Sequence, residues 1–511
     1  MIADRAARHA ALTAGEFDVL IIGGGITGAG VARDAATRGL RTALVERDDY
    51  ASGTSSRSSR LVHGGVRYLE HGHFHLVFEA SRERRTLLRI APHLVRPLPF
   101  TWPVYRGARV PRWKLGAGLL LYDTLALWRN VAPHRRLDPA AVLDREPALD
   151  QTDLVGGAVY YDAATDDARL TLATALGAAA AGAVVTNHAE ARAITHDASG
   201  RAVGAVVRDT LTGAEVHVAA RLVVNAAGPW GDAIRRLDYR PDTETVRGTK
   251  GVHVAVPANR VGNRGAVTLV SALDGRVMFV LPAPPHTIIG TTDTPALSGP
   301  DDVRASEEDI SYLLESVNAA FPGAHLLRND VVSAWAGIRP LVAAHNEGDP
   351  SSASREHSID ASPSGVITVT GGKLTTYRAM AAEVVDAAEQ ALRVAHTPAC
   401  THVTLLPGGD RETAVRQLAV TSPSLAVPLL EGFAYTAADL VYAVQHEHAC
   451  TLGDLLIRRT HIAFETSDAG ATVAPRAAAT VAPFLQWSEA DQKAQVEAYT
   501  REAARIFAVD P

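Results

Sequence analysis

Three glycines near the amino terminus have the types and spacing needed to bind a dinucleotide. Gly23, Gly25 and Gly28 form a G-x-G-x-x-G pattern, and Glu46 follows downstream. Glycines so spaced permit a tight turn and a close backbone approach, and the N-terminus of a following helix offers N–H groups to a diphosphate. A carboxylate placed as Glu46 is can bind ribose hydroxyls. The pattern predicts a nucleotide site; a glycine turn with packing duties only is the alternative.

The elements around these glycines are those that such a site requires. The apolar run FDVLII at 17–22 predicts a buried strand, and residues 29–38 predict a helix closed by Gly39. Residues 42–45 predict a second buried strand. This order of strand, turn, helix and strand is a dinucleotide-binding unit, which serves FAD and NAD alike.

Two later segments favour FAD over NAD. RLVVNAAGPWGD at 221–232 is a strand that ends in small residues, among them Ala227 and Gly228. TVTGGKLTTYR at 368–378 is a strand, a Gly-Gly turn and a helix start. Returning strands suit a large cofactor held at three places along the chain. The last turn also aims a helix N-terminus at the flavin edge, where negative charge develops on reduction.

Length and composition restrict the class of protein. The chain has 511 residues, of which 47% are hydrophobic, so it can bury two sizeable cores. A net charge of -6 without any Lys/Arg block argues against nucleic acid as a partner. Two cysteines suit a reducing compartment, and the N-terminal MIADRAARHAALTAGE lacks the apolar core of a secretory signal. We therefore expect cytoplasmic exposure.

The run TSSRSSRLVHGGVRYLE at 54–70 closely resembles the FAD-dependent glycerol-3-phosphate dehydrogenases, the respiratory enzymes of glycerol catabolism. The resemblance covers residues 17 to 465, and several of its segments are long and unusual. The further segments, in chain order, are RGTKGVHV (247–254), IIGTTD (288–293), GIRPL (337–341), GGKLTTYR (371–378), LPGG (406–409) and DLLIRRT (454–460).

The resemblance implies an α/β fold with three parts. The first is an FAD-binding, Rossmann-like domain of the glutathione-reductase/D-amino-acid-oxidase type. A substrate domain built on an antiparallel sheet is interleaved with it, and the two form one oxidoreductase unit over 1–395. A helical C-terminal domain follows over 396–511. The expected FAD-binding segments are 17–100, 155–250 and 355–395, and the expected substrate-domain segments are 101–154 and 251–354.

The resemblance also implies an activity and its partners. The substrate is sn-glycerol 3-phosphate, which is oxidised to dihydroxyacetone phosphate by hydride transfer from C2 to N5 of FAD. Ubiquinone or menaquinone at the membrane surface is the usual acceptor, which places the enzyme peripherally on the inner face of the cell membrane. The identity of the quinone, the catalytic base, the role of the C-terminal domain and the oligomeric state, with a homodimer among the options, stay open.

Catalytic and substrate-binding roles are carried over residue by residue. The HGGxRY match gives them to His63, Arg67 and Tyr68. Arg339 in GIRPL and Lys373 in GGKLTTYR are placed near the substrate phosphate, which a planar fork and a mobile point charge suit. His63 would accept the proton or orient the hydroxyl, because the pKa of imidazole lies near the working pH. The alternative is that His63 is a buried structural histidine whose hydrogen bonds are made within the protein.

His253, in KGVHV, is a further candidate for catalysis beside the flavin. Here the chain departs from the family's usual Lys-Gly-Ser-His, because Val252 stands where serine is usual. The remaining cofactor contacts are expected along the matched segments. They are Thr54, Ser55, Ser58, Ser59, Leu61, Gly64, Gly65, Gly372, Leu374 and Thr375, besides the glycines, Glu46, Ala227 and Gly228 named above.

Two groups of histidines invite comparison with metal sites, and we expect no metal at either. A solvated or substrate-proximal surface is the expectation for the first group, and the second lacks a further pair at zinc-ligand spacing. The groups are His71, His73 and His75 in EHGHFH, and His446, His448, Cys450 and His461 near the C-terminus.

The segment RVPRWKLGAGLLLYDTLALWR, from Arg109 to Arg129, combines basic residues at its start with leucine and aromatic side chains. An amphipathic segment of this kind suits the lipid interface and an enzyme that must reach a quinone. Packing against the protein's own core or a subunit partner is an equal alternative. The Ala-rich stretch 170–186 is too poor in strongly apolar residues to span a membrane, and predicts a soluble helix and strand.

Three rival functions stay open at this point. An oxidase of the same substrate would reduce oxygen to hydrogen peroxide. A glycine- or sarcosine-type flavin amine oxidase shares the nucleotide pattern and the GTTD segment, although it has no need of a phosphate-binding Arg and Lys pair. A non-catalytic flavin-binding module would bind FAD without turnover.

Overall fold

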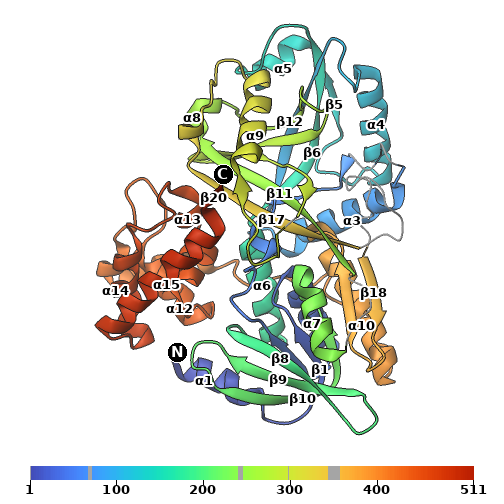
Figure 1. Ribbon diagram of the computed structural model, residues 1–511. Coiled ribbons are helices and arrows are strands. Elements are labelled where there is room, and N and C mark those ends of the chain that lie inside the picture. The colour runs from blue at the N-terminus through green and yellow to red at the C-terminus, as the bar shows by residue number, and fades with distance from the viewer. Residues whose placement is uncertain (1, 67–68, 70–71, 240–244, 297, 343–356) are drawn as a thin grey trace.

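The computed structural model describes residues 2–66, 69, 72–239, 245–296, 298–342 and 357–511. Its fold is α/β with three parts (Figure 1). One part is built on an eight-stranded sheet, the second on a ten-stranded sheet, and the third is a group of C-terminal helices. This arrangement confirms the fold class expected from the sequence.

The eight-stranded sheet has a parallel core that carries the nucleotide pattern. Three helices pack on one another and on this sheet in a single apolar core: α2 (Ile26–Thr37), α6 (Asp167–Ala180) and α10 (Tyr377–Leu392). The parallel strands, in order across the sheet, are β7 (Val184–Thr186), β2 (Thr42–Val45), β1 (Phe17–Ile22), β10 (Glu215–Asn225) and β19 (Ile367–Gly371). The antiparallel strands are β8 (Ala189–His196), β9 (Ala202–Asp209) and β18 (His357–Ala361).

Most of the expected elements of this sheet form where the apolar runs predict them. Strands β1 and β2 have the predicted bounds, and α6 followed by β7 confirms the helix and strand expected in the Ala-rich stretch. The strand expected to begin at residue 221 is the second half of β10, which is continuous from Glu215 to Asn225. No turn-forming residue separates the two halves, so β10 pairs with β9 along its first half and with β1 along its second.

The ten-stranded sheet is mostly antiparallel. Its longest strands are β4 (Val95–Tyr105), β6 (Leu154–Thr165), β11 (Val246–Pro257) and β17 (Ser333–Val342). Between them along the chain come β12 (Ala266–Val270), β13 (Val277–Ala283) and β14 (His286–Gly290). Because β4 and β6 pair along their whole length, they run across the boundaries expected near residues 100 and 155. The division of the chain into domain segments stays a prediction.

The C-terminal helices dock through buried ion pairs. They include α12 (Ala437–His446), α14 (Ala474–Leu485), α15 (Glu489–Phe507) and the short helix η8 (Asp454–Arg459). Arg459 of η8 donates to both carboxylate oxygens of Asp49 at 2.6 and 2.9 Å, and Arg458 donates to the same carboxylate at 2.8 Å. Asp49 lies three residues beyond Glu46, so the C-terminal helices hold the loop that follows β2.

Candidate active site

A cavity of about 560 Å³ opens at the carboxyl ends of the parallel strands. Its walls come from both sheets, since residues from β1, β2 and β19 face others from β6, β11, β13 and β17. The carboxyl edge of a parallel sheet is where ligands of such folds bind. A nucleotide and its substrate are therefore expected to bind in this cavity.

The glycine turn has the geometry that a diphosphate site requires. Gly23 adopts a φ of +113°, and a Cβ atom on Gly28 would collide with the carbonyl oxygen of Gly23. Gly25 is the N-cap of α2, so the helix N-terminus faces the cavity. The Ser55 hydroxyl accepts a hydrogen bond from the Ile26 N–H at 3.0 Å, which brings the 54–59 run against this turn.

Glu46 lies directly after β2, in the cavity wall. Its carboxylate accepts hydrogen bonds from the Gly24 N–H at 2.6 Å and from the Asp48 N–H at 2.9 Å. Burial, and then the neighbouring Asp48 carboxylate, raise the pKa of Glu46 above its usual value. The acceptor is thus fixed at the edge of the cavity, where it can receive ribose hydroxyls.

The hydroxyl run lines the cavity but also bonds to the protein. Thr54 donates to the Ile338 carbonyl at 2.6 Å, and Ser58 donates to the Asp167 carboxylate at 2.7 Å. The Ser59 hydroxyl and the His253 ring are 2.9 Å apart. With Ser55, these residues join the glycine turn, β17 and β11 around one cavity. Their contacts with a cofactor stay predictions.

His63 follows the short strand β3 (Leu61–Val62) and lines the cavity. Its N–H donates to the Thr375 hydroxyl at 3.1 Å, and that hydroxyl donates to the His63 carbonyl at 3.3 Å. The next N–H, of Gly64, donates to the buried Asp162 carboxylate at 3.0 Å. Contacts from both sides therefore fix the backbone that carries the His63 ring. Arg67 and Tyr68 lie outside the described residues.

Arg339, on β17, is held by the ends of neighbouring strands. Its guanidinium donates to the Thr291 hydroxyl at 2.9 Å, to the Thr292 carbonyl at 3.1 Å and to the Asp293 carboxylate at 3.1 Å. Gly251 of β11 leaves room for the guanidinium, because a Cβ atom there would lie 2.7 Å from its central carbon. Lys373, in the turn after β19, lines the same cavity. The two predicted phosphate ligands are thus brought to one cavity.

His253 is buried and neutral. Its ring stacks on Trp335 with centroids 5.6 Å apart, and a Cβ atom on Gly290 would lie 2.9 Å from its Nε2 atom. Burial, together with the charges of Arg339 and Arg60, lowers the pKa of His253 to about 3. The side chain cannot therefore take up a proton near neutral pH, although it can orient Ser59.

The remaining predicted cofactor residues lie in or behind the wall. Leu61, Gly65, Ala227, Gly228, Gly372, Leu374 and Thr375 line the cavity. Gly64 lies behind the lining, where a Cβ atom would lie 2.8 Å from the Ser81 hydroxyl. Sequence reasoning did not select Arg57, Asp162, Phe279 or Asp293, which also line the cavity. Asp293 could have been found, since it ends the matched IIGTTD segment.

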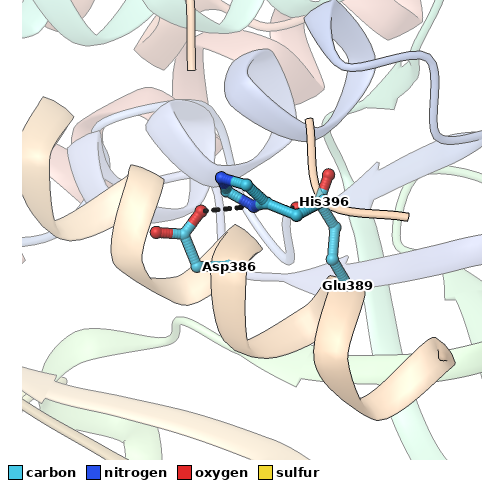
Figure 2. Close-up of side chains that lie close together, drawn as sticks. All are labelled: Asp386, Glu389 and His396. Carbon is cyan, nitrogen blue, oxygen red and sulfur yellow. Dashed lines mark hydrogen bonds and ion pairs between the residues drawn. The ribbon is translucent and has the colours of Figure 1, made fainter. Parts of the chain in front are cut away.

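One group of side chains among the described residues has donor atoms close enough to share a metal ion: Asp386, Glu389 and His396 (Figure 2). Arg38 already contacts these carboxylates, with its Nη1 atom 2.5 Å from Asp386 and 3.2 Å from Glu389. We interpret the group as an ion-pair cluster between α2 and α10. Of the histidines considered from the sequence, His448 contacts Tyr50 and His461 contacts Asp166.

The amphipathic segment forms α4 (Arg112–Leu125) and the loop after it. Leu119 and Tyr122 pack into the core, whereas Trp113 and Trp128 are 72% and 60% exposed. Other exposed apolar side chains on this segment, the following loop and the contacting helix α3 (Phe74–Ile90) are Leu120, Leu121, Leu127, Val131, Phe74 and Phe78. One face thus serves the core and the other is an exposed apolar surface. No helix in the described ranges is both long and apolar enough to cross a membrane.

Comparison with known proteins shows to which family the chain belongs. Residues 18–387 match the family described as FAD dependent oxidoreductase, and residues 375–492 match the C-terminal domain of alpha-glycerophosphate oxidase. Glycerol-3-phosphate dehydrogenase 2 of Mycobacterium tuberculosis is 39% identical over 97% of this chain and 90% of its own length. The chain belongs to the FAD-dependent glycerol-3-phosphate dehydrogenase family. The human mitochondrial glycerol-3-phosphate dehydrogenase is 38% identical over 94% of this chain and 72% of its own length.

A solved structure from the same family supports this assignment. The glycerol-3-phosphate dehydrogenase of Bacillus halodurans, complexed with FAD, is 31% identical with a TM-score of 0.79, over 98% of this chain and 97% of that one. A glycine oxidase from Bacillus cereus is 20% identical with a TM-score of 0.52, over 77% of this chain and 99% of that one. The second likeness shows a shared fold and nothing more.

FAD is the cofactor of this family, and the cavity fits it. The turn at Gly23 and Gly28 leaves no room for side chains and exposes the N-terminus of α2 to a diphosphate. Glu46 offers a fixed acceptor in the cavity wall, and the turn after β19 lines the same cavity. When bound, FAD would supply the redox centre of the enzyme.

Proposed function

We propose that this enzyme oxidises sn-glycerol 3-phosphate to dihydroxyacetone phosphate with FAD and passes the electrons to a membrane quinone. The observation that carries the proposal is the placement of Arg339 and Lys373 in the cavity that holds the glycine turn. A planar guanidinium and a mobile ammonium are the groups that bind a phosphate dianion. The names of the relatives in this family supply the same substrate.

Arg339 is the group that positions the substrate in this proposal. Bonds to Thr291 and Asp293 fix its guanidinium, so a phosphate held there has one preferred position. Lys373 approaches from the turn after β19 and adds a second positive charge. Binding energy from the phosphate then orients C2, the carbon that loses a hydride, instead of only increasing affinity.

His63 is the better candidate for the base that takes the hydroxyl proton. An imidazole is a common general base, and the His63 backbone is fixed by Thr375 and by the Gly64 to Asp162 bond. His253 is unsuited, because its pKa of about 3 leaves it too weak a base near pH 7. We assign His253 an orienting role through Ser59.

The exposed apolar surface supports the proposed acceptor and location. Trp113 and Trp128 project from α4 and its following loop, and basic residues such as Lys114 lie on the same helix. Such a surface suits the lipid interface, where aromatic rings lie at headgroup level and basic groups meet anionic lipid. We therefore propose peripheral attachment to the inner face of the cell membrane, which gives access to ubiquinone or menaquinone.

Steady-state assays separate this proposal from its rivals. With a dye as acceptor, glycerol 3-phosphate should reduce the enzyme far faster than glycerol, glycine or sarcosine, because only it carries a phosphate for Arg339. Faster turnover with glycine or sarcosine would support an amine oxidase. Rapid oxygen consumption in the absence of quinone or dye would support an oxidase. Under nitrogen and without a dye, turnover should stop, and a soluble quinone analogue should restore it.

A further inference from the structure

Arg57 is a buried cation with no anion beside it. It follows the short helix η1 (Thr54–Ser56), lines the flavin cavity and is only 8% exposed. Within the described part of the chain, its side chain makes one hydrogen bond, from Nη2 to the Ser52 carbonyl at 3.3 Å. No carboxylate of that part lies within ion-pair distance of its guanidinium.

The other buried arginines of the described residues show how unusual this is. Arg38, Arg84, Arg378, Arg458 and Arg459 each form an ion pair with a carboxylate. Arg33 has no such pair but donates to the carbonyls of Thr401 and Thr404, and it does not line the cavity. A buried charge is costly unless it is paired. Arg57 alone combines burial, a missing counter-charge and a place in the cavity wall.

The surroundings of Arg57 do not supply the missing charge. Burial, and then the positive charges of Arg505 and Arg458, lower the pKa of Arg57 to about 10. Glu502 and Asp48 act on Arg57 only at longer range. The Glu502 carboxylate is committed to Arg458 at 2.7 Å, and the Asp48 carboxylate to Arg47 at 3.2 Å. The nearest acceptors are therefore neutral or occupied, so an anion must come from the cavity.

The position of Arg57 indicates which anion. Arg57 bonds to Ser52, whose hydroxyl reaches the Glu46 carboxylate at 3.4 Å. Ser55, two residues before Arg57, accepts from the Ile26 N–H at the start of α2. Arg57 is thus linked through Ser52 to the predicted ribose acceptor, and it lines the same cavity wall as Ser55, which contacts the helix N-terminus that faces a diphosphate.

We propose that Arg57 binds the diphosphate of FAD as a cationic clamp that complements the N–H groups of the glycine turn. This inference rests on FAD as the cofactor and is independent of the substrate and acceptor proposed above. It has a distinctive consequence. Because the guanidinium lacks a counter-charge until FAD binds, it destabilises the apoprotein and stabilises only the FAD-bound enzyme.

The test compares Arg57→Met with Arg57→Lys and with Arg378→Met, a matched control whose guanidinium pairs with Glu83. FAD release from the holoenzyme is followed as free-flavin fluorescence after dilution, and the melting temperature of the apoprotein is measured separately. We expect Arg57→Met to release FAD at least tenfold faster while its apoprotein melts at an equal or higher temperature. Arg57→Lys should fall between it and the wild type, and Arg378→Met should lower the apoprotein melting temperature.

Three outcomes would overturn the proposal. Unchanged FAD release in Arg57→Met would remove Arg57 from the cofactor site. A destabilised or unfolded Arg57→Met apoprotein would assign the side chain a structural role. A raised KM for glycerol 3-phosphate at saturating FAD, with normal FAD release, would assign it to the substrate phosphate instead.

Discussion

The guanidinium of Arg339 on β17 lies against Gly251 of the neighbouring strand β11, two residues along from Thr249, its partner in the strand register, so closely that the glycine sets the place of the guanidinium. A Cβ atom on Gly251 would lie 2.7 Å from Cζ of Arg339. The guanidinium is bounded on its other side by Thr291 and Asp293, so it cannot retreat without losing those bonds. The position proposed to hold the substrate phosphate therefore depends on a missing side chain on another strand.

Gly251→Ala should for this reason impair substrate binding without touching the substrate itself. Loss of well-placed bonds to a charged group costs about 1.5–3 kcal/mol, so we expect kcat/KM for glycerol 3-phosphate to fall about 10- to 100-fold. Steady-state kinetics with a dye acceptor measure this. Gly299→Ala is the control, because nothing lies within 4 Å of a Cβ atom there. Unaltered kinetics in Gly251→Ala would separate Arg339 from the phosphate.

His253 should make the protein less stable in acid. Its folded pKa is about 3, whereas an unfolded histidine titrates near ~6.5. Below that pH the unfolded chain binds a proton that the folded protein does not, so the free energy of unfolding falls by about 1.4 kcal/mol per pH unit. Above pH 7 the ring is neutral in both states and contributes no pH dependence.

His253→Gln lacks this titration. From pH 8 to pH 7 the wild type and the variant should differ in melting temperature by a constant amount. By pH 5 the difference between their free energies of unfolding should have shifted against the wild type by about 2 kcal/mol. Thermal melts across this range supply the test. A wild-type advantage that stays constant or grows toward acid would show that the ring is protonated in the folded protein.

Asp162 should stabilise both the fold and the position of His63. Its Oδ1 atom accepts from the Gly64 N–H at 3.0 Å, from the Tyr122 hydroxyl at 2.6 Å and from Arg84. Asp162→Asn leaves Arg84 buried without a carboxylate, at a cost of about 3–5 kcal/mol. We expect a lower melting temperature and a lower kcat.

Tyr122→Phe provides the matched comparison, because it removes the hydroxyl that donates to Asp162 and accepts from Arg84, both at 2.6 Å, and keeps the ion pair. The loss of these two bonds should be about 1–3 kcal/mol. If Asp162→Asn melted no lower than Tyr122→Phe, the carboxylate would not be the anchor of this loop.

The nucleotide half of the site could be predicted from the sequence, whereas much of its support could not. Strands β1 and β2 and the glycine turn follow from local apolar runs and from backbone demands that only glycine meets. Asp162 escaped notice because it acts on Gly64, 98 residues away in the chain. Its role depends on strand pairing that no local pattern encodes. The same holds for Arg57, whose character depends on which carboxylates are absent around it.

The substrate half rested on the family resemblance. His63, Arg339 and Lys373 line one cavity, as the matched segments imply, although their roles stay predictions. The sequence could not reveal that His253 is too weak a base, because its pKa depends on burial against Trp335 and on the charge of Arg339. Burial is the largest cause of the lowered pKa of His253, and the sequence alone does not show that this side chain is buried.

The exposed tryptophans should control membrane binding. Trp113→Ser combined with Trp128→Ser removes the two most exposed rings of the α4 surface. We expect cosedimentation with anionic vesicles and quinone-linked turnover to fall, while turnover with a water-soluble dye stays unchanged. Leu211→Ser, an exposed apolar residue in the turn between β9 and β10, is the control. Equal sedimentation of all variants would assign the α4 surface to a protein contact.

The most direct test of the whole account is an anaerobic titration of the purified holoenzyme with glycerol 3-phosphate, followed by the visible spectrum. We expect the oxidised-flavin band at about 450 nm to bleach completely with glycerol 3-phosphate, to persist with glycerol, and to return when a soluble quinone is added. A flavin band that stays unbleached at every concentration of glycerol 3-phosphate would contradict the proposed substrate.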